Sequence, residues 1–254
     1  MASRAGQNEH DSPRRPTLVG MCGRTALTAS PDELREVFDL DGTPEVEPHH
    51  NVPPSAVVHA VRVLSGRKGR HLDALRWGLV PHWATDPKIG HRLALARVES
   101  VVTAPAFRQA IRRRRCLVAV DAFYEWRRDG SRSQPFLFRR ADGKPFALAA
   151  VWERWTSSDG EVIESCAVIT QPARPPADAI HDRMPLVLDA DAWDAWLDPR
   201  VVSPDEIASL LGPHAPNLVT FPVTPRVNDP RYDRPDCFAP EVEAQLGLPL
   251  PPAS

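Results

Sequence analysis

Cysteine is scarce in this sequence, and the cysteines that are present lie far apart. The 254 residues include four, with no C-x-x-C motif and no Cys/His spacing that would suggest zinc. A metal site and a disulfide scaffold are therefore poor interpretations. Cys116, Cys166 and Cys237 lie in or near apolar segments, where a lone cysteine is usually a small core residue.

Long apolar runs are missing as well. No run approaches the roughly 20 residues that a membrane span needs, and residues 1–20 lack the apolar middle of a signal peptide. We therefore expect a soluble, cytoplasmic protein without a membrane partner.

Linkers rich in glycine and serine are absent, and so are repeats of fixed period, which favours one domain. The 28 prolines disfavour long helices. We expect an α+β fold, a single domain with a mainly antiparallel, barrel-like β-sheet and short flanking helices. Residues 1–20 are interpreted as a disordered extension, 21–240 as the folded domain and 241–254 as a C-terminal tail.

Local patterns place several elements within that domain. Ser30, Pro31 and Glu33 supply the N-cap, first-turn proline and capping-box glutamate of a short helix, and Ser203 with Glu206 forms a second box. Further helices are predicted at residues 104–114, 191–197 and 205–211. Strands are predicted at residues 56–64, 116–120, 136–139, 146–151 and 166–170.

Positive charge is concentrated in the middle of the chain. Residues 51–150 hold 19 lysines and arginines against 7 acidic residues, and the remainder holds 12 against 26. Five of these are Arg108, Arg112, Arg113, Arg114 and Arg115. Together with nearby tryptophans they suit single-stranded nucleic acid. A solvated helix face is at least as good an interpretation of the arginines alone.

Cys22 differs from the other cysteines because it directly follows Met21. A chain that started at Met21, or was cleaved there, would leave Cys22 with a free thiol and a free α-amine. This 1,2-aminothiol can condense with an aldehyde near neutral pH and then close a five-membered ring. An internal cysteine or a lysine cannot do this.

Two further residues are candidates for proton transfer. Glu125 stands between Tyr124 and Trp126, after an apolar strand. It is either a strand-end acid paired with an arginine or a carboxylate desolvated by those aromatics. His181, between Ile180 and Asp182 in a turn, is the best general acid-base candidate among the nine histidines, most of which are expected to be surface or packing residues.

Six motifs, read in order, resemble the SRAP family, the SOS response-associated peptidases, also called abasic site processing proteins. They are Met21-Cys22-Gly23-Arg24, Asn51-Val52-Pro53-Pro54, Trp77-Gly78-Leu79-Val80-Pro81, Ala96-Arg97-Val98-Glu99-Ser100, Phe123-Tyr124-Glu125-Trp126 and Ile180-His181-Asp182-Arg183-Met184-Pro185. The resemblance runs from about Cys22 to about Asn228 and so covers nearly all of the predicted domain.

The resemblance implies a function for each matched residue. Cys22 would form a thiazolidine crosslink with abasic sites in single-stranded DNA, with Glu125 assisting proton transfer and peptide processing and His181 acting on the deoxyribose. Arg24, Arg97 and Arg183 would hold phosphates. Asn51, Pro54, Trp83 and Trp126 would shape the pocket and wedge the strand at the lesion. The protein would act as a monomer on the nucleoid, and no cofactor is implied.

The chain departs from the family pattern at two places. Twenty residues precede Met21, so either translation starts at Met21 or the extension is removed, for which self-cleavage by Cys22 and Glu125 is one hypothesis. Leu95 replaces an asparagine of the family. Two alternatives therefore stay open beside the crosslinking enzyme with lyase-like chemistry. One is a thiol peptidase acting on itself or other chains, and the other is a non-catalytic paralogue that binds single-stranded DNA.

Overall fold

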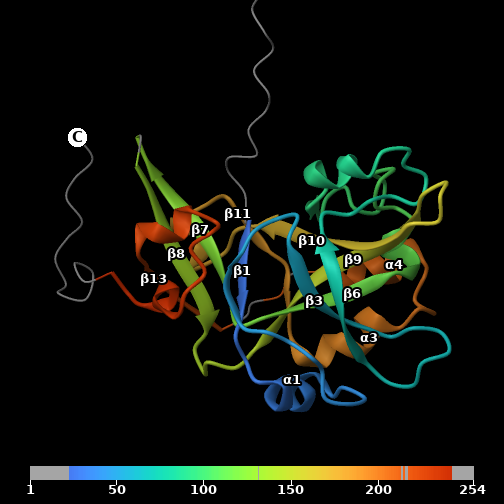
Figure 1. Cartoon of the computed structure of the whole chain (residues 1–254), viewed down its shortest axis with the longest axis horizontal. Helices are drawn as coiled ribbons and strands as arrows, with labels where there is room; N and C mark the ends of the chain where they lie inside the picture. Colours follow the sequence, from blue (N-terminus) through green and yellow to red (C-terminus); the bar gives the residue numbers. More distant parts are fainter. Residues whose placement is uncertain (1–22, 131, 213, 215–216, 242–254) are drawn as a thin grey trace, which may run out of the picture.

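The computed structural model describes residues 23–130, 132–212, 214 and 217–241 (Figure 1). Cys22 and the expected extension over residues 1–20 lie outside the described residues. So does the expected tail beyond Glu241.

A closed barrel of five strands forms the centre of the molecule. Its strands pair in the cyclic order β10-β4-β3-β6-β9 and back to β10, and only the β10–β4 pairing is parallel. The barrel strands are β3 (Val57–Arg62), β4 (His71–Trp77), β6 (Arg115–Val120), β9 (Phe146–Thr156) and β10 (Val162–Pro172). The expected α+β fold with a barrel-like, mainly antiparallel sheet is confirmed.

Strand β6 shows why the barrel is stable. Cys116 and Val118 belong to one buried cluster, and Leu117 and Ala119 belong to another. Because side chains alternate along a strand, β6 is buried on both faces. This double burial explains why the segment is continuously apolar in the sequence.

A second sheet of five strands packs beside the barrel, in the order β13-β8-β7-β1-β2 (Figure 1). The strands are β1 (Arg24–Leu27), β2 (His49–Val52), β7 (Ala122–Asp129), β8 (Arg132–Arg140) and β13 (Leu218–Pro222). Phe123 and Phe138 stack at 4.9 Å and share a cluster with residues of the barrel. The opposite face is covered by η4 (Pro225–Asn228) and η5 (Pro235–Phe238).

Short elements complete the fold. Strands β5 (Leu95–Arg97) and β11 (Arg183–Pro185) pair with β10, and β12 (Val187–Leu188) pairs with β9. The helices are α1 (Pro31–Phe38), α2 (Ala110–Arg113), α3 (Trp193–Leu197), α4 (Pro204–Leu210), η1 (Pro87–Arg92), η2 (Ala177–Ala179) and η3 (Ala190–Ala192). None of the helices in the described part of the chain has the length and apolarity to cross a membrane.

Most of the local predictions hold, and one helix prediction is wrong. The Ser30 side chain accepts a hydrogen bond from the Glu33 backbone, and Ser203 with Glu206 forms a complete capping box. The helix predicted over residues 104–114 is reduced to α2, and the residues before it fold into turns. Gln109, the residue before α2, makes no side-chain cap, and Pro105 lacks the N–H that a continuous helix would use.

The five clustered arginines do not form one solvated face. Arg115 is buried, and its guanidinium donates to five backbone carbonyls, including that of Trp196 at 2.6 Å. Arg114 pairs with the buried Glu153 at 2.7 Å. Only Arg108, Arg112 and Arg113 are left exposed. Two of the five are therefore structural.

Candidate functional site

The start of β1 is the point where the chain arrives from Cys22. Arg24 lies opposite Tyr124 in the antiparallel pairing of β1 with β7. Glu125 is the next residue along β7, so the register brings the first described residues close to this carboxylate. In the view of Figure 1, β1 lies between β7 on one side and the barrel strands β3 and β6 on the other.

Glu125 is buried, with only 1% of its surface exposed. Tyr124 and Trp126 do not enclose it, contrary to one of the two interpretations of the sequence. Side chains alternate along β7, and both aromatics pack in the cluster beneath η4 and η5. Glu125 shares the other face with Phe123, toward the barrel. The barrel side of β7 therefore removes this carboxylate from water.

His181 lies in the turn between η2 and β11. Its Nδ1 is 3.0 Å from the backbone nitrogen of Arg183, which can only donate a hydrogen bond, and 3.0 Å from a carboxylate oxygen of Asp182, which accepts one. The neutral ring can thus accept from Arg183, and the charged ring can donate to Asp182. A role of His181 in proton transfer stays a prediction.

Arg24, Asn51 and Trp126 meet around η4. The Arg24 guanidinium donates to the side-chain oxygen of Asn51 and to the carbonyl of Val227, both at 2.8 Å. It also lies 5.8 Å from the Trp126 ring, whose indole N–H donates to Asn228 at 2.6 Å. Burial lowers the pKa of Arg24, although Asp229 and other nearby groups act in the opposite direction.

The Asn51 amide makes its hydrogen bonds inside the protein. Its nitrogen donates to the carbonyls of Val227, Asp229 and Tyr232 at 3.1, 3.1 and 2.9 Å. With its oxygen bound by Arg24, Asn51 joins β2 to the segment that follows β13. Asn51 therefore shapes the site indirectly, by positioning Arg24 and the segment after β13.

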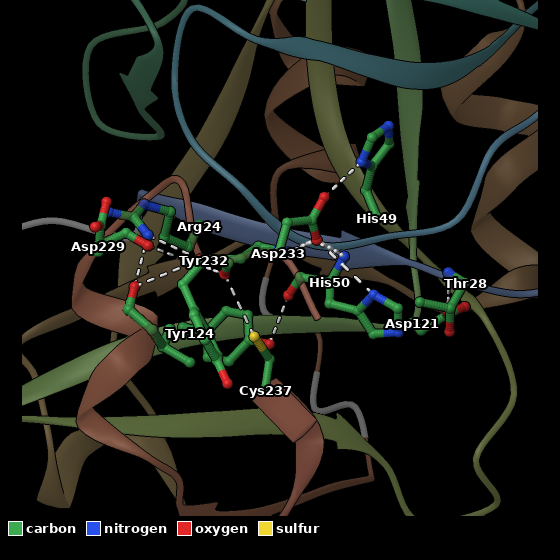
Figure 2. Close-up of polar contacts among 12 residues, drawn as sticks. Arg24, Thr28, His49, His50, Asp121, Tyr124, Asp229, Tyr232, Asp233 and Cys237 are labelled. Atoms are coloured by element: carbon green, nitrogen blue, oxygen red, sulfur yellow. Dashed lines mark hydrogen bonds and ion pairs between the residues drawn. The ribbon is translucent and has the colours of Figure 1, made fainter. Parts of the chain in front are cut away.

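Asp233 makes a second connection to β2, which the sequence did not indicate. Its carboxylate accepts from His49 at 2.7 Å and from the backbone N–H of His50 at 2.5 Å (Figure 2). It also accepts from the backbone N–H of Asn51 at 3.1 Å. Partial burial acts to raise the pKa of Asp233, but these hydrogen bonds outweigh it and hold the pKa below its ordinary value. The two histidines lie more than 180 residues away in sequence, so no local pattern could reveal the contact.

Arg97 and Arg183 come from two short strands that both pair with β10. Thr170 of β10 lies opposite Arg97 of β5, and Pro172 lies opposite Arg183 of β11. Glu99 accepts from both terminal nitrogens of Arg183, at 2.5 and 3.1 Å, and this contact holds the pKa of Glu99 below its ordinary value. Arg97 is exposed, whereas a phosphate at Arg183 would compete with Glu99.

The two remaining predicted residues, Trp83 and Pro54, lie on loops, and Leu95 lies in β5. Trp83 is 51% exposed, which suits a residue that stacks on a base. The Trp155 indole anchors its loop through the carbonyl of Ala84 at 2.7 Å. Pro54 lies half-buried in the turn after β2. Leu95 packs against the barrel cluster as an apolar side chain, in place of the amide that the family resemblance would put there.

The described cysteines do not offer a nucleophile. Cys116, Cys166 and Cys237 are buried, and burial raises the pKa of each thiol, that of Cys166 to about 12. Since the thiolate is the reactive form, these three groups are inert near neutral pH. Their interpretation as core residues is confirmed.

Comparison with known proteins gives the family. The model of the SOS response associated peptidases (SRAP) matches residues 21–230. The chain belongs to the SRAP family. Abasic site processing protein YoaM of Bacillus subtilis is 36% identical over 216 residues, which cover 83% of this chain and 94% of the relative. Abasic site processing protein HMCES of Xenopus tropicalis is 29% identical over 262 residues, covering 86% and 78%.

The fold of the SRAP chain also matches solved structures. A crystal structure of a protein from Bacteroides thetaiotaomicron superposes with a TM-score of 0.76 at 22% identity, covering 87% of this chain and all of the other. The SRAP match begins at Met21 and ends just after Asp229 of the site segment. It therefore spans every residue that the sequence predicted for the site, from Cys22 to Arg183, and it ends before Asp233.

Proposed function

We propose that this SRAP chain processes abasic sites in single-stranded DNA by forming a covalent crosslink through Cys22. The observation that carries the proposal is the family match over residues 21–230, together with relatives that are named abasic site processing proteins. The burial of Glu125 next to the start of β1 supports it, because the chain from Cys22 arrives there.

The reaction needs only groups that the chain and the lesion supply. The α-amine of an N-terminal Cys22 condenses with the ring-opened aldehyde of the abasic site and releases one water. The Cys22 thiol then adds to the imine carbon, and its proton moves to the nitrogen, which closes a thiazolidine. This product is neutral at the former imine, so it does not promote strand cleavage by β-elimination.

Glu125 and His181 have separate tasks in this proposal. Glu125 exchanges protons with the amine and thiol, and the same group assists removal of the residues before Cys22. His181 acts on the deoxyribose, opening the ring and returning a proton during reversal, because its Nδ1 has both a donor and an acceptor within reach.

The DNA strand is bound by charge and stacking. Arg24 and Arg97 attract phosphates, Arg183 does so in competition with Glu99, and the exposed Trp83 stacks on a base. This combination supports single-stranded DNA as the substrate, since an abasic site beside unpaired bases lets an aromatic side chain enter the strand. We place the action of the protein on chromosomal DNA.

Blocking the α-amine separates this proposal from a thiol peptidase. In protein that begins at Cys22, acetylation of the amine is expected to abolish covalent capture of an abasic oligonucleotide, because no imine can form. An acyl-transfer nucleophile needs only the thiol, so peptide cleavage would survive the same treatment. The yield of adduct and of cleaved peptide is read by mass spectrometry.

The control is protein acetylated only on lysine, with the α-amine intact. Full adduct yield from this control and none from the α-acetylated protein supports the crosslinking reaction. Equal adduct yield from both would contradict the proposed thiazolidine. Reversible binding of abasic and intact strands alike, with no adduct from any form, would point to a non-catalytic paralogue.

A further inference from the structure

The turn between β2 and β3 carries a serine where the backbone favours glycine. The N–H of Ala56 donates to the carbonyl of Pro53 at 3.2 Å, so Pro54 and Ser55 are the central residues of the turn. Ser55 has φ +74°, the left-handed conformation that a type II turn requires at this position. Glycine and asparagine adopt it most easily. The serine is thus a strained choice that adds a hydroxyl group.

That hydroxyl ends a chain of polar contacts. The Oγ of Ser55 is 2.9 Å from Nδ1 of His91 in η1, and Nε2 of His91 is 3.4 Å from Nη2 of Arg76 in β4. A guanidinium only donates hydrogen bonds, so Nε2 accepts, and the neutral ring carries its hydrogen on Nδ1. His91 then donates to Ser55. The Ser55 hydrogen is left to donate to a ligand.

Backbone contacts fix the position of both ends of this chain. The N–H of Ser55 donates to the carbonyl of Trp77 at 2.6 Å. A Cβ added to Gly78 would lie 2.6 Å from the carbonyl oxygen of Gly90. A Cβ added to Gly90 would lie equally close, 2.6 Å, to the carbonyl oxygen of Gly78. Only two glycines allow η1 to approach the end of β4 so closely, and this approach places His91 beside Ser55.

The location of these residues connects them to the candidate site. β2 runs antiparallel to β1, with Val52 opposite Thr25, so the turn after Val52 lies beside the start of β1. Ser55 and His91 are exposed, and Arg76 is half-buried. Within the described ranges, no ion pair neutralises Arg76. The surface therefore presents an oriented hydroxyl donor with a positive charge behind it.

We propose that Ser55, His91 and Arg76, here called the Ser55 relay, bind a phosphate of the DNA strand that flanks the lesion. Serine hydroxyls and arginines are common donors to phosphate oxygens. Ser55 donates directly to the phosphodiester, His91 orients the hydroxyl, and Arg76 supplies the charge. The relay rests on the proposed function, and it adds a contact that fixes the register of the strand beside Cys22.

The test uses the full chain carrying Cys22→Ala, so that only reversible binding is measured. Ser55→Gly is expected to weaken binding of a single-stranded abasic oligonucleotide about tenfold. Its melting temperature should stay within about 2 °C, since relief of the strained backbone offsets the freedom that glycine gains in the unfolded chain. Arg76→Gln should weaken binding and reduce the slope of log K against log salt by about 0.7.

A modified strand and a matched variant make the test specific. In a series of abasic oligonucleotides, one phosphate at a time is replaced by an uncharged methylphosphonate. At one position it should weaken binding by the parent protein more than binding by Ser55→Gly, because the variant has already lost the hydroxyl contact and keeps only the attraction of Arg76. Arg200→Gln removes an exposed arginine that is paired with Asp198 far along the chain, and it should leave affinity and slope unchanged.

The possible failures are distinguishable. Unchanged binding by Ser55→Gly at every salt concentration overturns the relay, and so does an equal loss in Arg200→Gln. If the Ser55 effect holds but protein beginning at Cys22 forms no adduct, the proposed function fails and the phosphate contact stands. A parent protein that binds no single strand overturns both.

Discussion

Glu125→Gln is expected to slow formation of the covalent adduct by a factor of about 10² to 10⁴, the usual contribution of a positioned general acid-base. Glutamine keeps the size of the side chain and removes its ability to take up or release a proton. Glu125 is 1% exposed, so water has little access to replace it. The measurement is the rate of adduct formation by protein beginning at Cys22, with protein in excess over an abasic oligonucleotide.

Reversible binding of the DNA by Glu125→Gln should change by less than about twofold, because a carboxylate does not bind phosphates. Glu164→Gln is the control: it neutralises a glutamate that pairs with Arg62 at 2.9 Å in the barrel. Its adduct rate should match that of the unsubstituted protein. A rate within threefold of normal for Glu125→Gln would remove Glu125 from the proton-transfer step.

Asn51→Asp is expected to destabilise the fold by about 3 kcal/mol or more. The substitution is nearly isosteric, but it turns an amide that donates to three carbonyls into an acceptor facing them. Arg24 would stabilise only the carboxylate oxygen that replaces the Asn51 amide oxygen, which its guanidinium contacts at 2.8 Å. A loss of this size corresponds to a melting temperature about 6–12 °C lower for a domain of this length.

The same change should also weaken DNA binding, since Arg24 and η4 lose their common support. Asn217→Asp is a matched control on an exposed asparagine, and it should unfold at the normal temperature. Thermal unfolding followed by circular dichroism provides the measurement. An unchanged melting temperature for Asn51→Asp would show that Asn51 does not hold the segment after β13 to β2.

Local physics made part of the fold predictable. The helix that follows Ser30 and the capping box of Ser203 depend on residues within one turn, so their signals survive in a single sequence. The apolar run in β6 is equally direct, because both of its faces are buried. For the closed barrel, only the fold class was predictable. The order of its strands was not, since contacts between distant segments determine it.

Long-range polar contacts were not predictable. Asp233 binds His49, which is 184 residues away in the sequence, and Glu99 binds Arg183, which is 84 residues away. No sequence pattern indicates that either pair is in contact. Arg115 looked like a surface charge, yet backbone carbonyls brought in by α3 and its neighbours satisfy it inside the protein. Burial of Glu125 was one of two interpretations that the sequence left open, and strand alternation moves the neighbouring aromatics, which were to cause it, to the opposite face.

The proposed chemistry depends on one bond between Cys22 and the lesion, and the intact mass of the adduct tests it directly. Protein beginning at Cys22 is incubated with a single-stranded oligonucleotide bearing one abasic site, then denatured and weighed. The expected mass is that of protein plus oligonucleotide minus one water, absent for Cys22→Ala. No adduct from the unsubstituted protein, or an equal yield from Cys22→Ala, would contradict thiazolidine formation at Cys22.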